Sequence, residues 1–181
     1  MSSLSLRPWQ MTDAASLAAA YRGSPDLERQ LDPDAGTAAG ARRIISADLG
    51  WDPQHACNLA VIAGGVAVGN VGISAIDFRH GTAWTYYWLA GPVRGKGLAA
   101  RAAAALANWA LTDLQLHRLE LGHRTNNPSS CRVARSAGFR PEGIQRAKLR
   151  YGTERFDVET HARLATDPVP ALLPLPLIQL P

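Results

Sequence analysis

The N-terminal part of the chain shows apolar residues at helical spacing. A short apolar strand at residues 4–7 leads to Thr12 and Asp13, either of which can cap a helix over residues 14–22. A second helical pattern covers residues 37–49, where apolar side chains recur every three or four positions. The loop between these two helices is rich in Asp, Pro and Gly. It forms either one wall of a substrate entrance or a plain surface connection.

From residue 58 the apolar residues follow the period of a strand. Residues 58–63 and 66–76 are dense in Val and Ile, and Gly64-Gly65 between them suits a tight hairpin turn. The chain then returns through residues 83–90. The pattern predicts three consecutive antiparallel strands.

The second half of the chain alternates between the two periods. We expect a long alanine-rich helix, a strand, a short helix and a final hairpin at residues 100–111, 117–122, 129–137 and 143–164. This order predicts one α+β domain over residues 1–166, which is an ordinary length for a single hydrophobic core.

The tail at residues 167–181 intersperses prolines with leucines. Proline lacks the backbone N–H of a regular helix or a central strand, so the tail should be extended. Its leucines would be costly to leave in water, and we expect them to lie along the domain or along an oligomer partner such as a second copy in a homodimer. Disorder of the tail is the alternative.

Composition and charge narrow the class of ligand. Hydrophobic residues make up 46% of the chain and charged residues 19%, which is typical of globular proteins. The net charge of +4 suits a small polyanionic ligand, but no basic block interleaved with aromatic residues predicts nucleic-acid binding. Residues 1–7 do not resemble a signal peptide and no apolar run could span a bilayer, so a cytoplasmic protein without a membrane partner is expected.

Cysteine and histidine positions predict neither a disulfide nor a metal site. Cys57 and Cys131 are far apart in the sequence, so two unpaired thiols are expected. The five histidines are scattered without the short spacing that metal ligands commonly show. We therefore expect no structural metal.

The stretch at residues 86–99 carries the strongest chemical signal. It combines an aromatic strand, a turn with two glycines and two cations, and a helix start without a side-chain cap. Uncapped N–H groups and the helix dipole attract an anion, and Arg94 and Lys96 add formal charge. A phosphate or pyrophosphate is the expected ligand.

Two common phosphate-binding loops fit this stretch poorly. A Walker-type loop needs Ser or Thr after Gly-Lys, and here Gly97 follows Lys96. A dinucleotide fingerprint is formally matched by Gly95, Gly97 and Ala100, with Glu120 as the acid that would bind ribose. That motif opens a parallel series of strands, however, whereas an antiparallel meander precedes this one.

Coenzyme A is the third candidate, and here the chain resembles a known family. The segment 94–99 resembles the acetyl-CoA pyrophosphate loop of the GNAT acetyltransferase superfamily, with Arg94, Gly97 and Ala99 at its pattern positions. Residues 126–140 resemble the Asn-x-x-Ser helix and the Gly-Phe strand start of the same superfamily. The element order and the final hairpin further resemble its RimJ/RimL-type subgroup, the ribosomal-protein N-terminal acetyltransferases.

The resemblance implies a fold with α/β/α layers. Its central mixed sheet would contain about seven mostly antiparallel strands and be flanked by about four helices. The fourth and fifth strands, here residues 86–90 and 117–122, would splay apart so that pantetheine lies between them. The tail after Ala165 lies outside the resemblance.

The implied activity is transfer of an acetyl group from acetyl-CoA to a primary amine by direct attack in a ternary complex. The acceptor would be a protein N-terminus or a small molecule such as an amine antibiotic, and succinyl-CoA is an alternative donor. A catalytically inactive protein that binds coenzyme A, as a sensor or scaffold, is the competing class.

The resemblance also implies which residues bind the cofactor and take part in the chemistry. Backbone near Leu89 would pair with pantetheine and polarise the carbonyl, and Ser130 would protonate the leaving thiolate. Ser130 could instead only cap its helix. The expected contacts of coenzyme A are Leu89, Arg94, Gly95, Lys96, Gly97, Leu98, Ala99, Asn127 and Ser130.

The general base is not obvious from the sequence. The ribosomal-protein subgroup has a Glu on the first strand of the last hairpin, but residues 146–149 contain no acid. Glu120 is the substitute candidate, because strand alternation places it on the face opposite to its apolar neighbours. An ion pair with Arg118 or Arg140 is the alternative role for Glu120, and an amine that arrives neutral needs no base.

Aromatic residues crowd the strand before the turn. Alternation places Trp84, Tyr86 and Trp88 on one face and Tyr87 on the other. We expect core packing to explain most of them, while one set could line the acceptor site.

Overall fold

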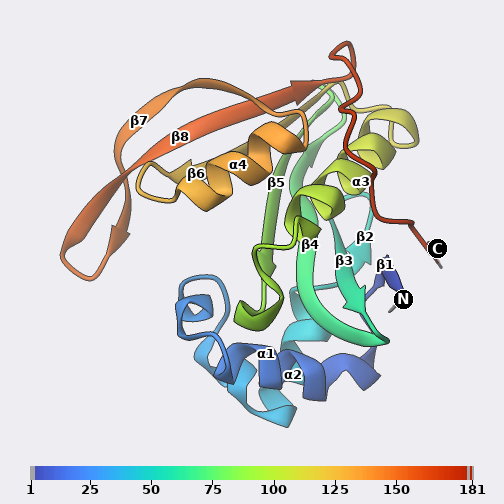
Figure 1. Ribbon diagram of the computed structural model, residues 1–181, viewed down its shortest axis with the longest axis vertical. Helices are drawn as coiled ribbons and strands as arrows, with labels where there is room; N and C mark the ends of the chain where they lie inside the picture. Colours follow the sequence, from blue (N-terminus) through green and yellow to red (C-terminus); the bar gives the residue numbers. More distant parts are fainter. Residues whose placement is uncertain (1–2, 179, 181) are drawn as a thin grey trace.

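One mixed eight-stranded sheet organises the chain (Figure 1). The computed structural model describes residues 3–178 and residue 180. Along the sheet the strand order is β1-β3-β4-β5-β6-β8-β7, with the two-residue β2 paired to β3. The strands are β1 (Leu4–Pro8), β2 (Trp51–Asp52), β3 (Ala56–Ala63), β4 (Val66–Asp77), β5 (Thr82–Leu89), β6 (Arg118–Arg124), β7 (Arg140–Tyr151) and β8 (Glu154–Leu164).

Helices cover both faces of this sheet (Figure 1). The α-helices are α1 (Ala14–Arg22), α2 (Ala38–Ala47), α3 (Leu98–Thr112) and α4 (Pro128–Ser136). Short 3₁₀ helices are η1 (Met11–Asp13), η2 (Pro25–Arg29), η3 (Pro33–Gly36) and η4 (Gly91–Val93).

Strand alternation divides the core into two halves. Leu59 and Val61 of β3 pack toward α3 and α4, whereas Ala60 and Ile62 of the same strand pack toward α1 and α2. Trp88 joins the α1–α2 side, and Tyr87 packs on the other side, as alternation predicts. The predicted α/β/α layering is therefore confirmed.

The sheet separates between β5 and β6. These two strands are parallel and pair only from Thr82 to Trp84, against Arg118 to Glu120. The other strand pairs are antiparallel. Beyond Trp84 the two strands diverge, which confirms the predicted splay and leaves room for a ligand within the sheet.

Two predicted boundaries shift in the structure. The alanine-rich helix begins at Leu98 rather than residue 100, because Gly97 takes a left-handed conformation (φ 74°) that starts the helix there. The last hairpin begins at Arg140 rather than residue 143, and its pairing with β8 is interrupted by register shifts. At one of these shifts Ala147 has φ 51°, and its N–H donates to Asp157 Oδ1 at 2.7 Å.

The described part of the tail is extended and lies against its own domain. Leu6 N–H donates to Pro176 O at 2.9 Å, and Ile178 N–H donates to Leu6 O at 2.8 Å. Leu175 is buried against the core that contains α3, and its N–H donates to Arg101 O at 3.2 Å. The tail thus occupies the outer edge of β1 and the side of α3 (Figure 1).

None of the helices in the described ranges combines the length and the apolar content needed to cross a membrane.

Candidate active site

Two connected hollows lie where β5 and β6 separate. The larger, of about 570 Å³, is bounded by the end of β5, the start of α3 and the helix α4. The smaller, of about 190 Å³, is bounded by β5, β6, the β7 strand and η2. Both are lined by Asp26, Gln30, Tyr87, Arg124, Asn127 and Ser130. A ligand in one hollow can therefore reach a ligand in the other beside Tyr87 and Ser130.

The turn before α3 presents free backbone N–H groups to the larger hollow. Gly95 and Gly97 have φ of 76° and 74°, and no side chain caps the helix. The first helical hydrogen bond joins Arg101 N–H to Gly97 O at 3.1 Å, so the N–H groups before Arg101 have no helical acceptor. No heavy atom lies within 4 Å of the Cβ position of either glycine. This open cradle matches the anion site expected from the sequence.

Arg94 connects this turn to η2, which lies on the other side of the larger hollow. Its Nε donates to Leu89 O at 2.8 Å, and its guanidinium lies 3.0 Å from the carboxylate of Asp26 in η2. Both charged side chains are partly exposed, so an incoming anion can compete with this ion pair at little cost.

Most of the predicted cofactor contacts line the larger hollow. Lys96, although next to the cradle, is exposed and is not among the lining residues. Those that do line it are Leu89, Arg94, Gly95, Gly97, Leu98, Ala99, Asn127 and Ser130.

Asn127, rather than Ser130, caps α4. Its Oδ1 accepts from Ser130 N–H at 3.1 Å, and Pro128 occupies the first helical turn. The hydroxyl of Ser130 is therefore not used as a cap, and its Oγ lies 2.7 Å from the phenol oxygen of Tyr87. The capping role weighed for Ser130 thus falls to Asn127.

Tyr87 joins Ser130 at the junction of the two hollows. Its hydroxyl also donates to Ser130 O at 3.1 Å. Burial raises the pKa of Tyr87 to about 12, against the smaller lowering by the Ser130 hydrogen bond. The phenol therefore carries its proton at neutral pH. The sequence left open whether Tyr87 packs in the core or lines the acceptor site, and its hydrogen bond to Ser130 has no signature in the sequence.

Glu120 lies outside both hollows. Its carboxylate accepts from Arg118 Nε at 2.6 Å, and the same guanidinium pairs with Glu142. Hydrogen bonds to Glu142 and to Glu120 raise the pKa of Arg118. The structure thus places Glu120 in the ion pair that was the alternative to its role as a base. Arg140, the other proposed partner, instead lies 3.4 Å from Asp167.

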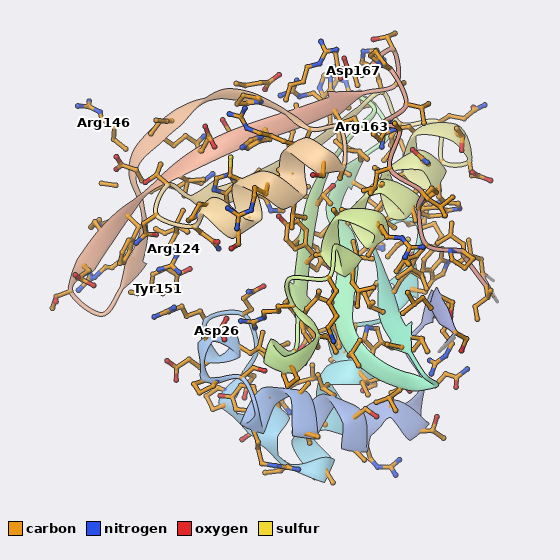
Figure 2. The ribbon with its side chains drawn as sticks, in the orientation of Figure 1. Asp26, Arg124, Arg146, Tyr151, Arg163 and Asp167 are labelled. Carbon is orange, nitrogen blue, oxygen red and sulfur yellow. The ribbon has the colours of Figure 1, made fainter. Side chains whose placement is uncertain are left out.

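The smaller hollow has a basic and aromatic wall. The guanidinium of Arg124 lies 5.4 Å from the ring centre of Tyr151, and that of Arg29 lies 5.7 Å from the same ring. Figure 2 shows Arg124, Tyr151 and Asp26 close together where the β7–β8 hairpin approaches η2. The loop after α1 therefore contributes a wall of this hollow, through Asp26, Arg29 and Gln30.

Comparison with known families agrees with this geometry. Residues 3–140 match the family model described as the acetyltransferase (GNAT) domain. The probable N-acetyltransferase YjcK of Bacillus subtilis (strain 168) is 28% identical over 153 residues, which are 80% of this chain and 84% of the relative. The uncharacterized N-acetyltransferase p20 of Bacillus licheniformis is 28% identical over 148 residues, 79% of this chain and 82% of the relative.

Solved structures share the fold over nearly the whole chain. RimL, a ribosomal L7/L12 α-N-protein acetyltransferase in complex with coenzyme A, superposes with a TM-score of 0.80 at 20% identity, covering 90% of this chain and 94% of RimL. Mycobacterium smegmatis RimJ in complex with a CoA-disulfide gives a TM-score of 0.77 at 26% identity, covering 90% of this chain and 82% of RimJ.

Proposed function

The chain belongs to the GNAT acetyltransferase family, and from this premise we propose that it transfers an acetyl group from acetyl-CoA to a primary amine by direct attack in a ternary complex. The observation that carries the proposal is the junction of the two hollows at Ser130 and Tyr87. A donor held in the larger hollow and an acceptor held in the smaller one would meet beside two hydroxyl groups.

The residues of the larger hollow suit coenzyme A. Free N–H groups at Gly97, Leu98 and Ala99 would bind the pyrophosphate, as helix N-termini bind phosphate generally. Leu89 at the end of β5 lies where the sheet has opened, so its backbone would pair with the pantetheine arm.

The hydroxyl groups of Ser130 and Tyr87 at the junction can supply the proton that the leaving group needs. The amine nitrogen attacks the thioester carbonyl carbon, the C–S bond breaks, and the sulfur leaves as a thiolate that needs a proton. Ser130 would donate that proton and take one from Tyr87, protonated and 2.7 Å away, and Tyr87 would be reprotonated through water by the proton that the attacking nitrogen releases as the amide forms. Among the residues lining the smaller hollow the acid is Asp26, which is paired with Arg94, so we propose that the amine arrives neutral and that water accepts the proton it releases on forming the amide.

The wall of the smaller hollow favours an acceptor with negative charge near its amine. Arg29 and Arg124 line it, and Tyr151 holds both guanidinium groups in place by cation–π contact. A polycationic amine antibiotic would meet charge repulsion there. A peptide N-terminus followed by acidic residues would instead form charge-assisted hydrogen bonds with arginine.

A mass-spectrometric screen tests this function. The purified chain is incubated with acetyl-CoA or succinyl-CoA and with matched peptides whose residues after the N-terminus are acidic, neutral or basic. We expect acetylation at the α-amine and a preference for acidic peptides. The variant Arg124→Gln should lose about tenfold in kcat/KM on the acidic peptide, the size of one charge-assisted hydrogen bond. Arg135→Gln, an exposed change away from both hollows, is the matched control.

Two results would contradict the proposal. Tight binding of acetyl-CoA without acyl transfer to any amine would favour the inactive sensor. Faster acetylation of basic peptides than of acidic peptides would contradict the role proposed for Arg29 and Arg124.

A further inference from the structure

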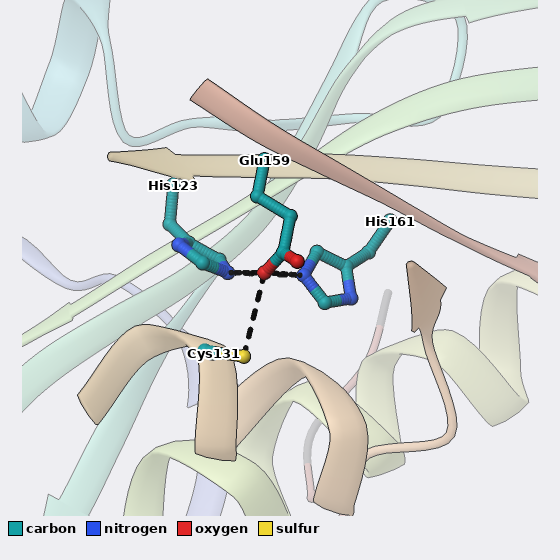
Figure 3. Close-up of side chains that lie close together, drawn as sticks. All are labelled: His123, Cys131, Glu159 and His161. Carbon is teal, nitrogen blue, oxygen red and sulfur yellow. Dashed lines mark hydrogen bonds and ion pairs between the residues drawn. The ribbon is translucent and has the colours of Figure 1, made fainter. Parts of the chain in front are cut away.

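Four potential metal ligands from three elements converge beside the active site. They are His123 of β6, Cys131 of α4, and Glu159 and His161 of β8 (Figure 3). Their ligand atoms all lie within 4.8 Å of one another. None of these four side chains takes part in the proposed acyl transfer.

Strand register brings three of these residues onto one face. His123 lies directly opposite Glu159 in the antiparallel pair of β6 and β8, and His161 is two residues further along β8. Residues two apart on a strand share a face, and α4 packs against this face with Cys131. The cluster is therefore built by tertiary structure from residues that are far apart in the sequence.

The separations are close to those around a tetrahedral zinc ion. The two Nε2 atoms of His123 and His161 are 3.0 Å apart, and Glu159 Oε2 lies 3.2 Å and 3.0 Å from them. Cys131 Sγ lies 3.4 Å from the same oxygen. Ligands bonded to zinc at about 2.0–2.3 Å in tetrahedral geometry are about 3.3–3.6 Å apart.

The histidine tautomers point their lone pairs into the cluster. Nδ1 of His123 faces Arg124 O at 3.0 Å, and Nδ1 of His161 faces Phe139 O at 3.4 Å. A carbonyl only accepts, so Nδ1 of each ring donates to it, and in the neutral form of each ring Nε2 presents a lone pair. Two such lone pairs beside a carboxylate oxygen repel one another until a cation lies between them. Backbone carbonyls behind the distal nitrogen are also typical of metal-binding histidines.

Burial and charge favour one particular ion. The side chains of His123 and His161 are 3% and 0% exposed, and that of Glu159 is 23% exposed. A divalent ion bound to one thiolate, one carboxylate and two neutral imidazoles leaves no net charge in this enclosed place. A thiolate with imidazoles suits zinc, whereas magnesium and calcium prefer ligands that are all oxygen.

We propose that His123, Cys131, Glu159 and His161 bind one Zn²⁺ ion. Binding releases the thiol proton of Cys131 to solvent and involves no oxidation or reduction. Four protein ligands complete the tetrahedron, so the site is structural rather than catalytic. Sequence spacing predicts no metal here, because the ligands come from three separate elements.

The position of the ion would let it hold α4 in place against the sheet. Cys131 follows Ser130 on α4, and β5 no longer pairs with β6 at this level of the sheet. A zinc ion would tether the helix that carries Asn127 and Ser130 to β6 and β8. This inference goes beyond the proposed acyl transfer and does not depend on it.

Metal content of the full chain tests the site directly. Protein produced without a histidine tag should contain one zinc per chain by inductively coupled plasma mass spectrometry. After removal of zinc by a chelator, titration with Co²⁺ should give the intense visible absorption of a tetrahedral site together with a thiolate charge-transfer band. Both measurements use the unmodified protein, so they do not depend on the folding of any variant.

Variants then identify the ligands. Cys131→Ser should abolish the thiolate band and weaken zinc affinity by about 100-fold or more, beyond the losses typical of outer-shell changes. Cys57→Ala, which removes the free thiol of β3, should keep the band. His161→Gln should lose the tetrahedral spectrum, whereas the exposed His80→Gln should retain it.

A combination of two results would overturn the zinc proposal. If unmodified protein is purified free of zinc, and its melting temperature does not change when ZnCl₂ is added in slight excess, the proposal is overturned. A proton shared among the two imidazoles and the carboxylate would then hold the cluster together.

Discussion

Ser130 and Tyr87 form the smallest unit to which the proposed reaction assigns a role. Their hydroxyl oxygens are 2.7 Å apart although one lies on α4 and the other on β5. Because burial raises the pKa of Tyr87 to about 12, the phenol should keep its proton throughout the neutral range and serve as a donor. The two groups are therefore expected to act as one proton relay.

At this scale we predict that Ser130→Ala lowers kcat by about 100-fold, the lower range for loss of a general acid, with little change in coenzyme A affinity. Tyr87→Phe should also lower kcat. The double variant should lose about as much as the worse single variant, because groups that act as a unit are not additive. Steady-state kinetics and calorimetry measure the two quantities separately.

The control for this pair is Ser46→Ala, an exposed serine of α2. Its kcat should match that of the unmodified protein. Unchanged turnover in Ser130→Ala would remove the relay and leave Asn127 as the important residue of this helix start.

At the scale of one element, the start of α3 is the proposed binding site of the donor. A left-handed glycine begins the helix, no side chain caps it, and the space above the turn is open. The partial positive charge of the helix end is thereby left for an anion. A long side chain in place of Gly97 would occupy the open space above this turn.

We predict that Gly97→Glu weakens acetyl-CoA binding by about 100-fold or more, because a carboxylate would repel the pyrophosphate at close range. The matched control is Gly65→Glu in the β3–β4 turn, where φ is +82° and the surroundings are also open. Both variants carry similar backbone strain, so both should lose similar stability. Equal calorimetric affinity of the two variants would refute the assignment of the cradle.

At the scale of the whole molecule, the tail completes the hydrophobic core. Leu175 is 2% exposed and belongs to the same cluster as β3, β4 and α3, whereas Leu173 is 73% exposed. Hydrogen bonds between the tail and Leu6 extend the edge of the sheet. The tail therefore acts as part of the folded domain.

We predict that Leu175→Ala lowers the free energy of unfolding by about 3 kcal/mol, as is typical for truncating a buried leucine. Leu173→Ala, two residues earlier on the same tail, should change it by less than about 0.5 kcal/mol. Urea denaturation of the two variants makes the comparison. Similar small losses in both would show that the tail does not contribute to the core in solution.

Local signals in the sequence predicted most of the fold. Period-two and period-3.6 patterns located α1 and the hairpin at Gly64-Gly65 almost to the residue, because both depend on contacts between near neighbours. The anion turn before α3 was equally visible, since its glycines and missing cap are local features. The register shifts in β7 were not visible, because they depend on pairing with β8.

Long-range pairing explains what the sequence left undecided. Strand alternation left Glu120 as either a candidate base or an ion-pair partner of Arg118 or Arg140, and only side-chain geometry shows the pair with Arg118. Arg124 and Tyr151 contact each other in the wall of the smaller hollow although they come from β6 and the end of β7. Such contacts have no signature in spacing, because loop length does not determine which strands become neighbours.

The sequence by itself determined the fold family and predicted a donor site, since a helix start, its glycines and its charges lie within one short segment. Tertiary structure alone decided the rest. The hydrogen bond of Ser130 with Tyr87, the basic wall of the smaller hollow and the cluster around His123 each join residues from separate elements. The physical reason is that an anion cradle needs only local backbone geometry, whereas proton relays, acceptor recognition and metal sites need side chains that packing brings together.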